Sequence, residues 1–292
     1  MKPAPFEYHA PDSLEQALEL MSQHAGEAKI LAGGQSLVPA MNFRAAQPAV
    51  LIDLNRAAEL SYIREDVNVI RIGAMARERH LEFDSTIAKR IPLLHEATPF
   101  IAHPQIRNRG TIGGSLVNAD PAAELPVLTT ALSARLKARN QSGERWIDAQ
   151  DFFVGMFTTA LNADEILVEI ELPFMPARTG WSFMEVAPRA GDYAMMGVAA
   201  LVTLDESGKC KGARIVYLNA GEGPVDAKET AKLLEGENIN DKLIDDAANM
   251  ASEKEINPFG NMHASVEFQR HLAKVLTQKT LRVAIQRAGE MQ

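Results

Sequence analysis

The 292-residue sequence contains a single cysteine, Cys210. One thiol cannot form an internal disulfide, and it cannot supply the several thiolates that hold an iron–sulfur cluster or a structural zinc ion. The sequence therefore excludes a disulfide-stapled scaffold and a cysteine-held metal centre within this chain. It also favours a reducing compartment, because disulfides are rare there.

Long apolar runs and positive charge are scarce as well. No stretch approaches the ~18 consecutive apolar residues of a membrane-spanning helix, and the first residues, MKPAPFEYHAPDS, lack the apolar core of a secretion signal. The formal net charge is −8, and a chain of this charge repels the nucleic-acid backbone. We therefore expect a protein that neither spans a membrane nor binds nucleic acid. Its expected location is the cytoplasm, either free or peripheral to the inner membrane face.

The common phosphate-binding motifs are missing too. The sequence has no G-x-x-x-x-G-K-S/T. The nearest approach to G-x-G-x-x-G is GEGPVD at residues 221–226, which ends in aspartate and contains a proline. These absences argue against a P-loop and against a standard Rossmann dinucleotide site.

The rest of the composition, 46% hydrophobic and 23% charged residues, is that of an ordinary folded protein. Strand and helix patterns predict an α+β fold in three parts, residues 1–57, 58–176 and 177–292. The third part reads as an antiparallel sheet packed with helices. The predicted strands are 28–32, 50–55, 67–74, 134–140, 164–173, 181–187, 197–205 and 213–221, and the predicted helices are 11–21, 80–98 with an interruption at Pro92, 227–235, 240–254 and 264–288.

Glycine pairs occur in two short stretches, AGGQSL at 32–37 (the first glycine segment) and TIGGS at 111–115 (the second glycine segment). Glycine after a strand indicates positive φ or a close approach to the backbone. Backbone N–H groups unobstructed by Cβ atoms, beside hydroxyl side chains, suit a diphosphate. A plain turn is the alternative at either place. After the second segment, Asp120 and Pro121 predict a helix start with aspartate as the N-cap.

AGGQSL and TIGGS, together with NADPAAELP at 118–126 and GDYA at 191–194, resemble the FAD-binding medium subunit of the molybdenum hydroxylases. These are the relatives of xanthine dehydrogenase and carbon monoxide dehydrogenase, and the correspondence covers essentially the whole chain. The resemblance implies a two-subdomain FAD-binding fold of the PCMH/VAO type. A C-terminal domain of three-stranded antiparallel sheet plus helices follows it. The FAD is expected to be held non-covalently.

The resemblance implies a role for each matching residue. Both glycine segments would bind the FAD phosphates, and Asp120 and Glu124 would contact ribityl or ribose hydroxyls. The alternative for these two is helix capping and a solvated first-turn carboxylate. Tyr193 would lie beside the flavin ring, or it only caps the entrance to a strand. Ile166 and Leu167 would pack near the ring, or they are strand core only. The implied cofactor-binding residues are Lys29, Ile30, Leu31, Ala32, Gly33, Gly34, Gln35, Ser36, Leu37, Ile101, Thr111, Gly113, Gly114, Ser115, Asp120, Glu124, Ile166, Leu167 and Tyr193.

The sequence departs from the family pattern at two places. Ser115 stands where the family often has asparagine, so a hydroxyl replaces an amide donor, and PRAGDYA at 188–194 keeps only Arg189 of a basic pair. His103 is a weaker candidate, which either reaches the cofactor or is structural. Arg107 and Arg109 either offset phosphate charge, contact a partner subunit or lie on a solvated surface.

The resemblance implies an electron-transfer subunit without catalytic or metal-ligating residues of its own. In this family a large subunit carries the molybdenum cofactor and oxidises the substrate, and a small subunit carries two [2Fe–2S] clusters. The medium subunit holds the FAD that collects electrons and passes them to an external acceptor. A dimer of heterotrimers is the expected assembly. Two alternatives are a stand-alone FAD-dependent reductase of the same superfold and a non-enzymatic scaffold subunit that has lost FAD.

Overall fold

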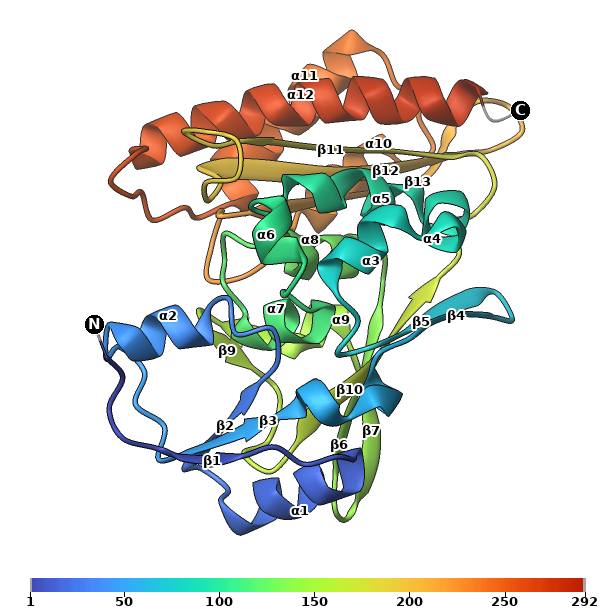
Figure 1. Cartoon of the computed structure of the whole chain (residues 1–292). Helices are drawn as coiled ribbons and strands as arrows, with labels where there is room; N and C mark the ends of the chain where they lie inside the picture. The colour runs from blue at the N-terminus through green and yellow to red at the C-terminus, as the bar shows by residue number, and fades with distance from the viewer. Residues whose placement is uncertain (1, 291–292) are drawn as a thin grey trace.

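The computed structural model describes residues 2–290 of the chain. Within these residues it contains three larger sheets with their helices and a two-stranded sheet. The larger sheets are stacked in Figure 1 from the N-terminal unit at the bottom to the C-terminal helix at the top. The α+β class expected from the sequence is confirmed. None of the helices within residues 2–290 is both long and apolar enough to cross a membrane.

The first sheet belongs to a small N-terminal unit. Its elements are β1 (Glu7–His9), α1 (Leu14–Gln23), β2 (Ala28–Leu31), α2 (Leu37–Asn42), β3 (Val50–Asp53) and the 3₁₀ turns η1 (Leu54–Arg56) and η2 (Ala58–Leu60). The strands are parallel, in the order β1–β3–β2. Helix α1 begins three residues later than the predicted 11–21, because Ser13 is its N-cap and the Ser13 hydroxyl accepts a hydrogen bond from the backbone N–H of Gln16. Strand β1 was not predicted, since its three residues carry no apolar alternation.

The second unit is built on a five-stranded antiparallel sheet. In spatial order its strands are β4 (Ile63–Asp66), β5 (Val69–Gly73), β10 (Ile166–Pro173), β6 (Arg135–Asn140) and β7 (Gly143–Asp148). Its other elements are α3 (Glu78–Phe83), α4 (Ser85–Arg90), α5 (Pro92–Ala97), η3 (Thr98–Phe100), α6 (Pro104–Arg107), α7 (Ile112–Asn118), α8 (Glu124–Ala131), α9 (Ala149–Phe152), β8 (Phe153–Gly155) and β9 (Thr158–Thr159). Pro92 starts α5, where its missing N–H is no loss.

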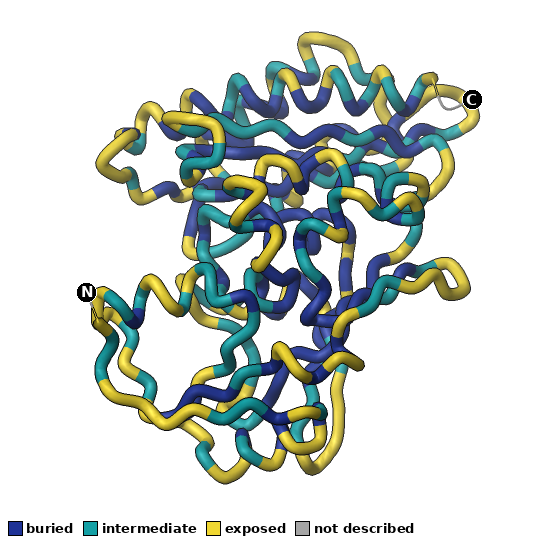
Figure 2. Tube along the Cα trace, in the orientation of Figure 1, coloured by how far each residue is buried: buried dark blue, intermediate teal, exposed yellow. Residues whose placement is uncertain are grey.

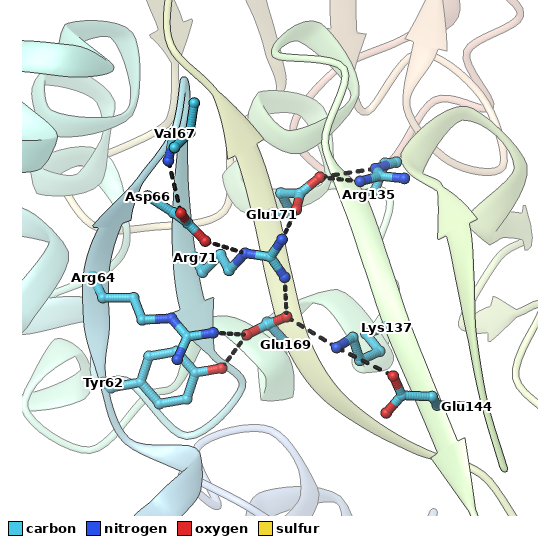
Figure 3. Close-up of polar contacts among 10 residues, drawn as sticks. All are labelled: Tyr62, Arg64, Asp66, Val67, Arg71, Arg135, Lys137, Glu144, Glu169 and Glu171. Atoms are coloured by element: carbon cyan, nitrogen blue, oxygen red, sulfur yellow. Dashed lines mark hydrogen bonds and ion pairs between the residues drawn. The ribbon is translucent and has the colours of Figure 1, made fainter.

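A buried ion cluster covers one face of this sheet (Figure 3). Glu169 and Glu171 on β10 are only 4% and 5% exposed. Arg71 of β5 reaches both carboxylates, at 3.1 Å from Glu169 and 2.8 Å from Glu171, and the Lys137 ammonium lies 3.3 Å from Glu169. Buried charges need such partners, so the cluster explains how two glutamates fit into an otherwise apolar strand. The remaining partners are Tyr62, Arg64 and Arg135.

The C-terminal unit is an antiparallel sheet beneath a long helix. Its elements are β11 (Thr179–Val186), β12 (Met196–Leu204), β13 (Cys210–Leu218), β14 (Val225–Asp226), α10 (Lys228–Leu234), α11 (Asp241–Met250), the π-helix η4 (Ala251–Glu255) and α12 (Val266–Glu290). The expectation of a three-stranded sheet is wrong, since the sheet has four strands in the order β11–β12–β13–β14. The fourth strand is the two-residue β14, which pairs with β13. A Cβ atom on Gly180 would lie 2.5 Å from the backbone nitrogen of Ala288. Glycine in β11 therefore lets α12 pack directly on the strand.

The C-terminal sheet is shared between two cores. Along β12, Val198, Ala200 and Val202 face the core under α12, whereas Ala199 faces a core that also contains the helices of the second unit. This alternation is the pleat of a sheet that is buried on both faces. The order of layers is therefore five-stranded sheet, short helices, C-terminal sheet and α12 (Figure 1).

Candidate cofactor site

The two glycine segments lie against each other. A Cβ atom on Gly33 would lie 2.8 Å from the Cα atom of Gly110 and closer still to the carbonyl oxygen of Arg109. A Cβ atom on Gly114 would lie 3.4 Å from the Cβ atom of Ala32. A side chain at position 33 would have to push the backbone of residues 109–110 away. The close approach to the backbone at Gly33 is therefore made by another part of the same chain, residues 109–110.

The first glycine segment presents a row of backbone donors. None of the N–H groups of residues 33–37 donates to an acceptor among residues 2–290. Gly34 has a φ of +74°, the left-handed region that glycine adopts without strain. Ser36 is exposed where the chain enters α2 and makes no capping hydrogen bond. Most of α2 is exposed or intermediate in burial (Figure 2). N–H groups of this kind at a strand-to-helix turn suit a phosphate.

The second glycine segment is not the loop of free donors that the sequence predicts. Thr111 is the N-cap of α7, and the following residues form the first helical turn. Gly113 donates to the carbonyl of Ala74, and Gly114 donates to the Thr111 hydroxyl at 3.0 Å. Ser115 donates to the Thr111 carbonyl. The expectation of available backbone donors at 113–115 is therefore wrong, since capping and a neighbouring chain already satisfy them. These glycines permit close packing instead.

The carboxylates after α7 differ from their sequence interpretation. Asp120 does not cap α8: its carboxylate accepts from the N–H of Ala122 within a turn, and Ala123 is the N-cap. Glu124 is buried rather than solvated. Burial raises the pKa of Glu124 to about 7, and the Asp120 carboxylate adds to the effect. Burial also raises the pKa of Asp120. Near neutral pH, Glu124 can therefore both donate to and accept from a hydroxyl group.

Tyr193 lies in the loop between β11 and β12 and is 70% exposed. Burial of its hydroxyl end, followed by the charges of Asp120 and Glu124, raises the pKa of the Tyr193 hydroxyl. The loop of the GDYA motif thus comes close to the carboxylates that follow α7. The structure brings Tyr193 near two carboxylates that lie far from it in the sequence.

The apolar candidates divide between two cores. Ile166 and Leu167 are consecutive on β10, so their side chains point to opposite faces of the sheet. Ile166 packs with Leu18 of the N-terminal unit, and Leu167 packs in the central core. The two side chains cannot both border the same ring from this strand. Ile101 is buried in the central core, 7% exposed.

The basic candidates are mainly structural. Arg107 is 5% exposed, pairs with Glu82 at 3.0 Å and donates to the carbonyl of Ile101 at 2.7 Å. Its interpretation as a solvated or phosphate-binding residue is wrong, because its donors are occupied inside the protein. The His103 ring packs against Gly191, so closely that a Cβ atom there would overlap it. His103 and Arg107 line a pocket of about 450 Å³. None of the implied cofactor-binding residues, from Lys29 to Tyr193, lines this pocket.

Asn55 is a site residue that the sequence analysis missed. Its side-chain amide donates to the carbonyl of Ala32 at 2.9 Å and to the carboxylate of Asp53. Strands β2 and β3 are parallel, so the residues that follow them share one edge of the sheet. The pattern VLIDLN, with polar residues directly after a strand, was the available signal.

The fit to a diphosphate can be judged from these contacts. Within residues 2–290, the N–H groups of residues 33–37 and the Ser115 hydroxyl have no hydrogen-bond partner, so they can donate to anionic oxygens. The carboxyl groups of Asp120 and Glu124 have the chemistry to hydrogen-bond with sugar hydroxyls. Within residues 2–290, no three His, Cys, Asp or Glu side chains form a group able to hold a metal ion. The fold and the site together define a protein that binds a dinucleotide cofactor.

Comparison with known proteins specifies the class further. A sequence profile described as "FAD binding domain in molybdopterin dehydrogenase" matches residues 4–175, and one described as "CO dehydrogenase flavoprotein C-terminal domain" matches residues 181–284. The chain belongs to this family of FAD-binding molybdopterin dehydrogenase subunits. The resemblance inferred from the glycine motifs is confirmed.

Individual relatives span the full chain. The "6-hydroxypseudooxynicotine dehydrogenase complex subunit alpha" of Paenarthrobacter nicotinovorans is 42% identical over 288 residues, covering 99% of this chain and 97% of that one. Carbon monoxide dehydrogenase from Hydrogenophaga pseudoflava, in a form lacking the Mo-pyranopterin moiety, superposes with a TM-score of 0.95 at 36% identity, over 98% of this chain and 99% of that one. Quinoline 2-oxidoreductase from Pseudomonas putida 86 gives 0.93 at 36% identity over 100% of both chains.

Proposed function

We propose that this chain is the FAD-carrying medium subunit of a multi-subunit molybdenum hydroxylase. It accepts electrons from [2Fe–2S] clusters of a small subunit and passes them to an external acceptor, while a large subunit with the molybdenum cofactor oxidises the substrate. The proposed assembly is a dimer of heterotrimers in the cytoplasm. The observation that carries the proposal is the row of free N–H groups at residues 33–37, packed against the start of α7 in a chain of this family.

Each part of the site has a proposed task. The N–H groups of residues 33–37 bind the diphosphate, with hydroxyl donors from Ser36 and Ser115. Asp120 and Glu124 bind ribityl or ribose hydroxyls, and Tyr193 covers the flavin ring from the loop between β11 and β12. The cofactor supplies the ability to take up two electrons and release them together or singly. The protein's own contribution is to bind, orient and shield.

The chemistry of the chain supports this division of labour. A single cysteine cannot ligate an iron–sulfur cluster, so the proposed [2Fe–2S] clusters belong to another subunit. The described residues also provide no metal-binding group. The identity of the oxidised substrate belongs to the large subunit and does not follow from this chain.

Binding of FAD to the purified full chain tests the proposal. We expect the chain to hold non-covalent FAD that acid releases, and the variant Gly114→Val to lose it while keeping its circular dichroism spectrum. The reason is that a Cβ atom at position 114 would lie 2.7 Å from the Thr111 hydroxyl oxygen and 3.4 Å from the Cβ atom of Ala32. The larger valine side chain would therefore fill the space between the two glycine segments. Gly212→Val is the matched control, because nothing lies within 4 Å of that position.

The outcomes separate the alternatives. Normal flavin content in Gly114→Val contradicts the assigned site. A wild-type chain that binds no FAD, even after incubation with it, indicates a scaffold subunit. A chain that holds FAD and reduces a substrate alone, with no iron–sulfur subunit present, indicates a stand-alone reductase.

A further inference from the structure

The guanidinium group of Arg77 links the backbone just before the second glycine segment to Asn55, which is hydrogen-bonded to the first glycine segment. Arg77 is the residue just before α3, and its backbone forms an isolated antiparallel bridge with Thr111. From there its side chain extends towards the first glycine segment. One terminal nitrogen, Nη1, donates to the carbonyl oxygen of Arg109 at 2.6 Å, and the other, Nη2, donates to the side-chain oxygen of Asn55 at 2.6 Å.

These bonds continue into the backbone beside Gly33. The amide nitrogen of Asn55 donates to the carbonyl of Ala32 at 2.9 Å. A continuous series of hydrogen bonds therefore runs from Ala32 through Asn55 and Arg77 to Arg109. It links the same two stretches of backbone that meet at Gly33. The planar guanidinium holds its donors in fixed directions, which the rotating donors of a lysine ammonium do not.

The charge of Arg77 is not neutralised by an ion pair. Among residues 2–290, neither Arg77 nor Arg109 lies within salt-bridge distance of a carboxylate, whereas Arg71 and Arg107 both do. Burial lowers the pKa of Arg77, the nearby charge of Arg109 lowers it further, and the charge of Asp53 acts in the opposite direction. Two arginines without a salt-bridge partner among the described residues thus belong to the backbone contact at Gly33, in a chain whose net charge is −8.

We propose that Arg77 is a positioning residue of the cofactor site, which fixes the separation of the two glycine segments and favours a diphosphate at residues 33–37. The proposal rests on the proposed FAD-binding function. Arg77 acts through the backbone it holds, because both of its donor ends are already engaged by protein acceptors. Its effect is on where the N–H groups point, and its residual charge adds an attraction for the anion.

Ligand affinity and the conservative variant test the proposal together. The affinities of the flavin-free full chain for FAD and for ADP are measured by fluorescence titration and competition. ADP is included because it carries the diphosphate without the flavin ring. The variants are Arg77→Gln, Arg77→Lys and Asn55→Ala, and Arg90→Gln is the control because Arg90 pairs with Glu65 away from the site. The thermal midpoint of each ligand-free variant is recorded in parallel.

We expect Arg77→Gln to weaken binding of FAD and ADP by the same factor, roughly tenfold to a hundredfold, because bonds from a charged donor are lost. Arg77→Lys keeps the charge but not the fork, so it remains at least about tenfold weaker than wild type. Asn55→Ala breaks the same series of bonds, so the double variant with Arg77→Gln is no weaker than the worse single variant. Arg90→Gln binds normally.

Three results would overturn the proposal. Wild-type affinity in Arg77→Gln removes any role for this residue. Full rescue by Arg77→Lys reduces the role to charge and refutes the positioning fork. Additive losses in the double variant show that Asn55 and Arg77 act separately. Failure of the wild-type chain to bind either ligand would instead refute the proposed function, so the two failures are distinguishable.

Discussion

Gly33 is the position where a single methyl group tests the packing of the site most sharply. In Gly33→Ala, the new Cβ atom would stand 2.8 Å from the Cα atom of Gly110, whereas ordinary contacts of a Cβ atom begin at 3.4 Å. The shortfall is at least 0.6 Å, and the neighbour is backbone that no rotamer change can move. The segments must therefore separate by about that much.

The expected cost follows from overpacking and from lost donors. Inserting a methyl group against fixed backbone destabilises by about 1–3 kcal/mol. If the shift also misaligns one charge-assisted hydrogen bond to the diphosphate, about 1.5–3 kcal/mol of binding free energy is lost. We therefore predict at least about a tenfold weaker FAD affinity. The assay is fluorescence titration of the flavin-free chain, with denaturant unfolding of the same sample.

Two comparisons make the result interpretable. Gly34→Ala meets only the flexible side chains of Leu31 and Val38, at 3.2 and 3.3 Å, but must adopt a positive φ of +74°. It should lose about 1–2 kcal/mol of stability from the backbone strain. Gly212→Ala faces open space and should leave stability and FAD binding unchanged. Wild-type stability and affinity in Gly33→Ala would refute the close approach of the two segments.

Two further predictions concern buried carboxylates. Glu169→Gln removes the anion shared by Arg71 and Lys137. We expect denaturant unfolding to show a loss of about 3–5 kcal/mol in the free energy of unfolding, because the partner charges stay buried. The control Glu144→Gln, at an exposed position, should lose less than about 1 kcal/mol, and equal losses would contradict the ion cluster. Glu124 has a folded pKa of about 7 against 4.5 ordinarily, so between these values the folded chain holds more protons than the unfolded one, and stability falls as the pH rises. The wild-type chain should lose on the order of 3 kcal/mol of unfolding free energy between pH 5 and 8, and Glu124→Gln should not show this loss. The same pH dependence in both proteins would contradict a buried protonated carboxyl at position 124.

The fold could be predicted wherever burial is recorded in the apolar pattern. Helix α1 and strand β10 follow their periodicities, because one face or both faces of each are buried. Strands β1 and β14 could not be found, since two or three residues have no measurable period. They are strands because a neighbouring edge pairs with them. Pairing of this kind is a property of the folded chain.

The site could be predicted in its parts and only partly in its construction. The glycine motifs identified both segments and the family, but not which segment keeps free donors. That difference depends on the Thr111 cap and on the contact of Gly113 with Ala74, both decided by tertiary structure. Arg77 carried no signal in the sequence. Its importance comes from contacts 22 and 32 residues away, one of them to a backbone oxygen.

Amide hydrogen exchange of the full chain, with and without FAD, shows which backbone N–H groups bind the cofactor. We predict that FAD slows exchange in the peptide that contains residues 33–37, where the N–H groups have no acceptor among residues 2–290. The amides of Gly113 and Gly114 already donate within the protein and should change much less. FAD binding with unchanged exchange at 33–37, or with protection confined to another part of the chain, would contradict the site described above.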